Sequence, residues 1–239
     1  MQISIILIAV GFVVGLLSGA VGFGGGMILL PVISSFYGIE VAVPVSTIAQ
    51  LMSNMSKVGM GIRQVQWRQV GLFLVFAAPL TALGAFGFTV VPKQLMTRIL
   101  SVFLIAFAIM KLTGKLKLPH NKVTVLAGGG ITGLINGLLG ISGPLSSAVF
   151  LTFELDPVAY IVSEAAAATV MHIIKIIMYG KLNLVNADIC LNGLYIGIAM
   201  MAGNFIALRF IKNIKKKTYQ RIVAFVMIVV SLWLFISVK

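Results

Sequence analysis

The sequence predicts an all-α, polytopic membrane protein made of two homologous, inverted repeats. Hydrophobic residues make up 60% of the 239 residues and charged residues only 10%, whereas soluble domains are roughly 25% charged. The mean hydropathy is +1.12. A second observation is a series of long apolar segments, and a third is a glycine pattern that recurs 118 residues further along the chain. Together these features exclude an ordinary soluble globular protein.

Ten apolar segments are expected to form helices, because about twenty apolar residues cross the hydrocarbon core of a bilayer. The first segment lacks the charged start and the cleavage site of a signal peptide, so we expect it to be a retained membrane segment. The second and seventh are too short to cross comfortably and indicate half-helices or re-entrant hairpins. The ten segments lie near residues 3–22, 27–39, 43–62, 70–91, 95–112, 123–139, 145–155, 157–179, 188–210 and 221–238.

Each short segment directly follows a glycine-rich break, Gly22-Phe-Gly-Gly-Gly26 in the first half and Gly140-Ile-Ser-Gly-Pro144 in the second. These breaks belong to the internal repeat, which divides the chain into a first transmembrane repeat (1–112), a basic linker loop (113–122) and a second repeat (123–239). The pairs that match at the offset of 118 are Gly15 with Gly133, Gly19 with Gly137, Gly22 with Gly140, Gly25 with Gly143, Ser46 with Glu164, Asn54 with His172 and Lys57 with Lys175.

The net charge of +13 would fit a nucleic-acid-binding protein, but the cations stand in short runs between apolar segments and form no basic face. The positive-inside orientation of a membrane protein explains them better. If each half crosses the membrane an odd number of times, the loop cations divide twelve to four between the two sides, against eight to eight for an even number. We therefore expect inverted repeats, with both termini outside the cytoplasm, in a multi-pass protein of the cytoplasmic (inner) membrane.

The glycine breaks are the first candidate binding residues. A helix that begins at a break has unpaired N–H groups and a positive dipole end, which favour an anion. Ser142 is expected as the N-cap and Pro144 at an early helical position. For the other repeated glycines, Gly15, Gly19, Gly22, Gly133, Gly137 and Gly140, close helix packing is preferred. The substrate-binding candidates at the breaks are Gly24, Gly25, Gly26, Ser142, Gly143, Pro144 and Leu145.

The third segment of each half supplies the remaining candidates, Asn54, Lys57, His172 and Lys175. Eleven residues return a helix close to its starting direction, so Glu164 and Lys175 face the same way. A buried lysine attracts an anion, although both lysines are also near enough to helix ends to snorkel. Glu164 and His172 are the proton-coupling candidates. The alternatives are that Glu164 pairs with a lysine and that His172 is a hydrogen-bonded interior residue.

Four stretches resemble the sulfite exporter TauE/SafE family, also called the toluene sulfonate uptake permeases. They are GLLSGAVGFGGGMILLPVISSFYG, the Ser46-Thr47-Ile48 helix, the turn that ends at Gln66-Trp67, and GLINGLLGISGP. The resemblance covers nearly the whole chain. It implies secondary transport of small sulfur-containing anions such as sulfite, sulfonates or sulfoacetate.

The expected function is therefore secondary transport of a small anion through a central site between the two breaks. No phosphate-binding loop for ATP is present, so transport would draw on a gradient, with a proton or sodium as the possible coupling ion, or on a partner. We expect no enzyme activity, cofactor, metal or nucleic-acid partner; the expected partners are the anion and the bilayer, and a homodimer is left open. A passive anion channel is the alternative. An intramembrane serine protease, suggested by Ser142 and His172, comes third.

Overall fold

The computed structural model describes residues 5–21, 25–112 and 119–210. Within these ranges every regular element is a helix, which confirms the all-α class and nine of the expected segments. The segment near 221–238 lies outside the described residues. The elements are α1 (Ile5–Val21), α2 (Gly25–Tyr37), α3 (Ile39–Gly61), the short 3-10 helix η1 (Ile62–Gln64), α4 (Trp67–Val90), α5 (Lys93–Leu112), α6 (Lys122–Leu139), α7 (Gly143–Leu151), α8 (Pro157–Lys181) and α9 (Ala187–Phe210).

Four of these helices are long and apolar enough to cross a membrane: α4, α6, α8 and α9. As expected, α2 and α7 are short, with 13 and 9 residues. Local signals set the helix ends. Asn121 caps α6 by accepting a hydrogen bond from the Thr124 N–H at 2.7 Å, and Pro157 begins α8.

The second break begins at Gly140, which ends α6 in the left-handed conformation with φ of 80°. The sequence predicted that this glycine serves close helix packing. The structure gives it a different role, because a residue without Cβ adopts positive φ without steric cost.

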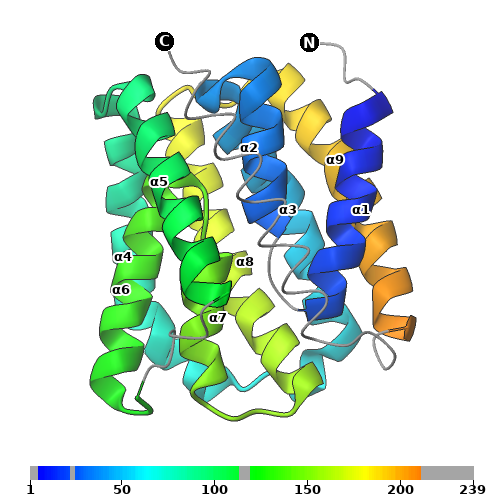
Figure 1. Cartoon of the computed structure of the whole chain (residues 1–239), viewed down its shortest axis with the longest axis vertical. Helices are drawn as coiled ribbons and strands as arrows, with labels where there is room; N and C mark the ends of the chain where they lie inside the picture. Colours follow the sequence, from blue (N-terminus) through cyan, green and yellow to red (C-terminus); the bar gives the residue numbers. More distant parts are fainter. Residues whose placement is uncertain (1–4, 22–24, 113–118, 211–239) are drawn as a thin grey trace.

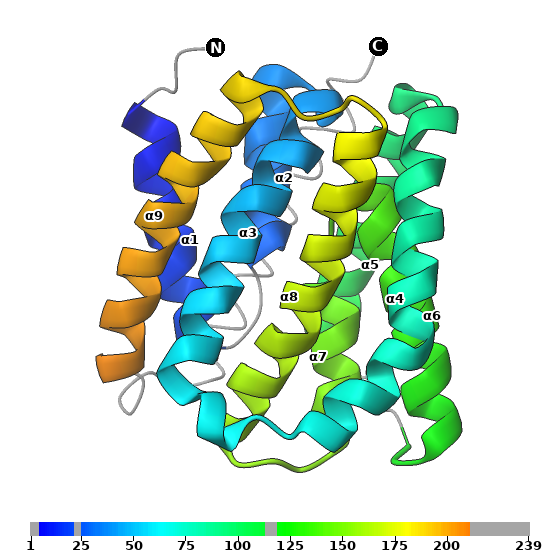
Figure 2. The ribbon, with the colours of Figure 1, turned by 180° about the vertical axis from the view of Figure 1, so that it is seen from behind.

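Helices α3 and α8 lie side by side in the middle of the molecule and run in opposite directions (Figures 1 and 2). Helices α1 and α9 cover one flank of this pair, and α4 and α6 form the other flank. The first long helix of each half therefore packs against a helix of the other half. Buried polar side chains are frequent on α3 and α8, so the most polar helices occupy the centre.

Both flanking pairs depend on glycine. A Cβ at Gly15 would overlap the backbone carbonyl of Met200 in α9, and one at Gly133 would overlap that of Ala77 in α4. Gly19 and Gly137 face backbone atoms of the same two partner helices. The packing role predicted for these four glycines is thus confirmed, whereas Gly22 lies outside the described residues.

Candidate functional site

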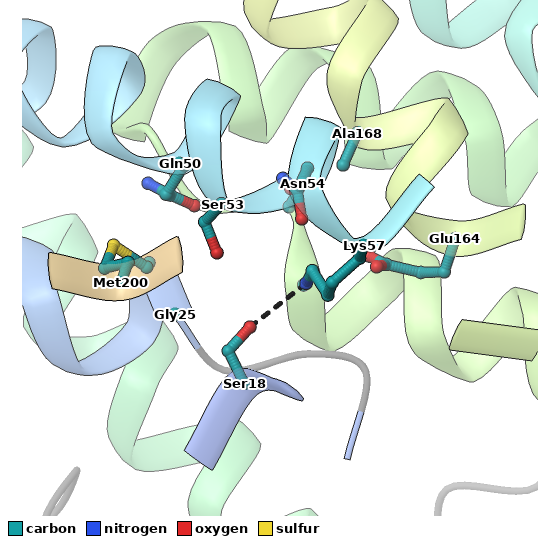
Figure 3. A pocket seen from close by; sticks show the side chains of 12 residues that line it. Ser18, Gly25, Gln50, Ser53, Asn54, Lys57, Glu164, Ala168 and Met200 are labelled. Carbon is teal, nitrogen blue, oxygen red and sulfur yellow. Dashed lines mark hydrogen bonds between the residues drawn. The ribbon is translucent and has the colours of Figure 1, made fainter. Parts of the chain in front are cut away.

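Helices α2 and α7 begin at the same pocket, which lies between α3 and α8 (Figure 3). The cavity volume is about 20 Å³, little more than the space that one water molecule needs. A small solute suits it better than a large one. The lining residues are Ser18, Gly25, Gly26, Gln50, Ser53, Asn54, Lys57, Ser142, Gly143, Glu164, Ala168 and Met200.

Both glycine breaks thus reach one site, as far as the structure describes them. Gly25 and Gly26 open α2, and Ser142 and Gly143 open α7. The first N–H groups of a helix have no intrahelical acceptor, so two positive helix ends face the pocket. Ser142 holds the N-cap position, but its side chain makes no capping hydrogen bond. Its hydroxyl is therefore not used to cap the helix that it precedes.

Two glycines leave room that another residue would fill. A Cβ at Gly25 would lie 3.0 Å from Cε of Met200 and 3.5 Å from Oγ of Ser18. A Cβ at Gly26 would lie 2.9 Å from Cδ of Gln50. Since all three neighbours line the pocket, a methyl group at either position would enter the site.

Lys57 and Glu164 bring opposite charges into the pocket. The Lys57 ammonium group donates a hydrogen bond to Oγ of Ser18 at 3.1 Å, and only 1% of Lys57 is exposed. Glu164, 2% exposed, accepts a hydrogen bond from Oγ of Ser146 at 2.6 Å. Figure 3 shows the Glu164 carboxyl group beside the Lys57 side chain, and the two charges lie close enough to attract each other. Lys57 therefore does not snorkel, and it shares its site with an acid.

Ser146 connects this acid to the second break. Its hydroxyl lies 3.0 Å from the carbonyl oxygen of Ser142 as well as 2.6 Å from the Glu164 carboxyl oxygen. A serine has a single hydroxyl proton, so it donates to one of these acceptors at a time. The charge on Glu164 thus affects a hydrogen bond at the first turn of α7.

Gln50 supplies a free donor. Its Nε2 atom is buried and has no hydrogen-bond partner among the described residues, and the side chain lines the pocket beside Gly26. A buried amide without a partner costs free energy unless a ligand or water accepts from it. Sequence reasoning missed Gln50, Ser18, Ser53 and Ser146. A signal for Gln50 was present, since it precedes Asn54 by four residues and so lies on the same helix face.

His172 and Lys175 do not line this pocket. Lys175 is fully buried, and its ammonium nitrogen lies 5.6 Å from the centre of the Tyr179 ring. Both ring nitrogens of His172 lack hydrogen-bond partners among the described residues, so Ser142 is not held against this base. Glu164 and Lys175 share a helix face, as predicted, but eleven residues of α8 separate them by about 16 Å. The predicted set is therefore divided between two places.

The remaining candidates from the second break have smaller roles. Leu145 is not a lining residue, and its N–H donates to the Ser142 carbonyl oxygen at 3.2 Å. Pro144 takes the early helical position expected of it, where its missing N–H is not needed. Gly24 lies outside the described residues. No metal-binding group of three His, Cys, Asp or Glu residues occurs in the ranges that the structure describes.

The pocket therefore combines the ammonium group of Lys57, the amide of Gln50 and two helix N-termini around one carboxyl group. Donors of this kind bind oxyanions through charge-assisted hydrogen bonds. Comparison with known proteins gives one match: the family model described as Sulfite exporter TauE/SafE matches residues 7–234 of the chain. No curated protein and no solved structure matches it.

Proposed function

The chain belongs to the sulfite exporter TauE/SafE family of membrane transporters, and on that basis we propose that it is a secondary transporter for a small sulfur-containing anion such as sulfite or sulfoacetate. The anion would cross the cytoplasmic membrane through the pocket between α3 and α8. One observation carries this proposal: both broken helices begin at a pocket that also contains a buried lysine. Positive helix ends that point at an anion near the bilayer centre are the usual construction of such transporters.

The charges suggest how a proton would take part. When Glu164 is ionised, its carboxylate competes with the anion for Lys57. Protonation of Glu164 removes that competition and leaves the ammonium group, the amide of Gln50 and the helix ends to the substrate. We therefore propose that anion and proton bind together, with Glu164 as the first proton carrier and His172 as the second candidate.

Alternating access would follow from inverted repeats. In support of them, α1 and its counterpart α6 run in opposite directions, as do α3 and α8 (Figures 1 and 2). Arg63 and Lys122 lie at the end of the molecule where α4 and α6 begin, and Lys93 and Lys181 lie at the opposite end. The positive-inside rule and the number of loop cations in the sequence favour a cytoplasmic location for the first of these ends.

Flux measurements in proteoliposomes test the proposal. Sulfite, sulfoacetate, taurine and sulfate would be compared with and without a proton or sodium gradient. We expect flux of the sulfur anions that rises with an inward proton gradient and shows counterflow against unlabelled substrate. Lys57→Met should abolish it. The matched control is Gly59→Ala on the same helix, where a Cβ meets nothing within 4 Å. Flux without counterflow would indicate a passive channel, and wild-type flux in Lys57→Met would contradict the proposed site.

A further inference from the structure

Three buried side chains that do not line the pocket have polar atoms without hydrogen-bond partners among the described residues. Asn136, His172 and Lys175 are each fully buried. Both amide atoms of Asn136, both ring nitrogens of His172 and the ammonium nitrogen of Lys175 lack hydrogen-bond partners among the described residues. Buried polar groups normally find partners, because an unmade hydrogen bond in the interior costs free energy. A concentration of unsatisfied donors therefore calls for a functional explanation.

These groups lie in one region. His172 and Lys175 are three residues apart and so lie on the same face of α8. The Lys175 ammonium group lies over the Tyr179 ring, whose hydroxyl donates to the Gly137 carbonyl oxygen at 3.0 Å, next to Asn136. Along α8, His172 follows Glu164 and Ala168, which line the pocket, and precedes Lys175. His172 therefore lies between the pocket and the Lys175 end of α8.

The internal repeat identifies the partner that Lys175 lacks. The offset of 118 pairs Lys175 with Lys57 and Asn136 with Ser18. In the first half the equivalent residues are hydrogen-bonded, since Lys57 donates to Ser18 at 3.1 Å. In the second half the same contact is not made. One of two equivalent places is thus assembled in this conformation, and the other is not.

The acids are distributed just as unevenly. Glu164 is the one buried acid of the sequence, since the remaining four, Glu40, Glu154, Asp156 and Asp188, are all exposed. Its equivalent in the first half is Ser46, so the repeat places a serine where the Lys175 end would need an acid. Glu164 thus serves as a counter-ion for Lys57. Lys175 has no equivalent acid, so a bound anion would have to neutralise its charge.

We propose that Asn136, His172 and Lys175 form a second binding site for the transported anion, here called the second station. By the internal repeat it is equivalent to the first station, at Ser18 and Lys57. The second station is occupied when the protein faces the opposite side of the membrane. This inference rests on the proposed function. The ammonium group would supply the counter-charge, and the Asn136 amide and a His172 N–H would donate to the oxyanion. In transport the anion would pass from one lysine to the other across the helix ends of α2 and α7.

Radiolabelled sulfite provides the test, with binding to the purified protein and counterflow in proteoliposomes measured side by side. We expect Lys175→Met and Asn136→Leu to lower counterflow by about tenfold or more, because each removes a hydrogen bond to a charged group. Binding should change by less than about threefold, since the pocket at Lys57 is intact in this conformation. Tyr179→Phe is the matched control: it removes a neighbouring hydrogen bond, keeps the ring, and should leave counterflow within about twofold.

Thermal stability separates lost function from lost folding. Lys175→Met removes a buried, unpaired charge, so the variant should be at least as stable as the wild type. Wild-type counterflow in both Lys175→Met and Asn136→Leu would overturn the second station. Failure of the proposed function has a different signature: Lys57→Met would then bind sulfite as the wild type does. Absence of saturable sulfite binding to the wild-type protein would overturn both.

Discussion

At the scale of single residues, Lys57 and Glu164 determine the charge of the pocket. Their opposite charges nearly cancel while Glu164 is ionised, and the pocket becomes cationic when Glu164 takes up a proton. In the proposed mechanism, substrate and carboxylate would compete for the same ammonium group, so the protonation state of Glu164 would control how strongly an anion is attracted.

Glu164→Gln should make anion binding almost independent of pH. In the wild type, binding should strengthen as the pH falls, by at most about tenfold per pH unit for a single linked proton. The glutamine is neutral at every pH, so the variant should bind at neutral pH as tightly as the wild type does in acid. Methanesulfonate is the suitable probe, because its own charge does not change over that range. A His172→Gln variant measured alongside shows which group carries the proton; an unchanged pH profile in both would exclude proton coupling through α8.

Gly25→Ala should weaken sulfite binding by about tenfold while the protein still folds. The added methyl would come 3.0 Å from the flexible end of Met200, a neighbour that can move, so the main consequence is a narrower pocket. A loss of this size corresponds to about 1.4 kcal/mol of binding free energy. Gly59→Ala serves as the control. It should bind normally and be up to about 1 kcal/mol more stable, since alanine favours an exposed helix position over glycine. Equal affinity in the two variants would remove Gly25 from the site.

Some residues of the pocket could be predicted from the sequence, and others could not. The repeat and the short helices predicted that Gly25, Ser142 and Lys57 would matter, and the structure brings these three to one pocket. The sequence pattern grouped Glu164 with Lys175 because both lie on the same face of a helix. Eleven residues of helical rise nevertheless separate them along the axis. Gln50 was missed because the repeat pairs it with Ala168. A polar residue paired with an apolar one did not stand out when the two halves were compared.

At the scale of helices, the flanking pairs α1–α9 and α4–α6 hold the central pair in place. Each pair approaches closely enough for backbone to touch backbone, and this depends on residues without side chains. Glycine thus performs three different tasks here: it brings helices together at Gly133, ends a helix at Gly140, and leaves space in the pocket at Gly25. The sequence pattern alone could not separate these tasks, because the same spacing of three or four residues runs through all of these glycines.

Gly133→Leu should destabilise the protein by about 1–3 kcal/mol, because the new side chain has to push α6 away from the carbonyl oxygen of Ala77. Thermal unfolding in detergent measures the effect. Gly71→Leu on α4 is the appropriate comparison, since nothing lies within 4 Å of a Cβ at that position. A Gly133 variant as stable as the Gly71 variant would mean that the α4–α6 contact is looser than described.

At the scale of the whole molecule, the two ends of the bundle should face different compartments. Gln64, just before the start of α4, and Asn183, just after the end of α8, are exposed, and these two helix ends lie at opposite ends of the structure. In a Cys190→Ser background, Gln64→Cys should react with a membrane-impermeant thiol reagent only in inside-out vesicles, and Asn183→Cys only in right-side-out vesicles or intact cells. Cysteines at positions 2 and 239 should behave like the one at Asn183. Cytoplasmic labelling of either terminal cysteine would contradict the inverted arrangement.

The packing of helices of one half against helices of the other half has a further consequence. Because α1 packs against α9 and α4 packs against α6, residues 1–112 expressed alone would expose the faces of α1 and α4 that these contacts bury, and would lack α8, the other wall of the pocket. Co-expressed as two chains, the halves should recover function only if they insert in opposite orientations. That result would make the chain a covalent fusion of two subunits of opposite membrane orientation.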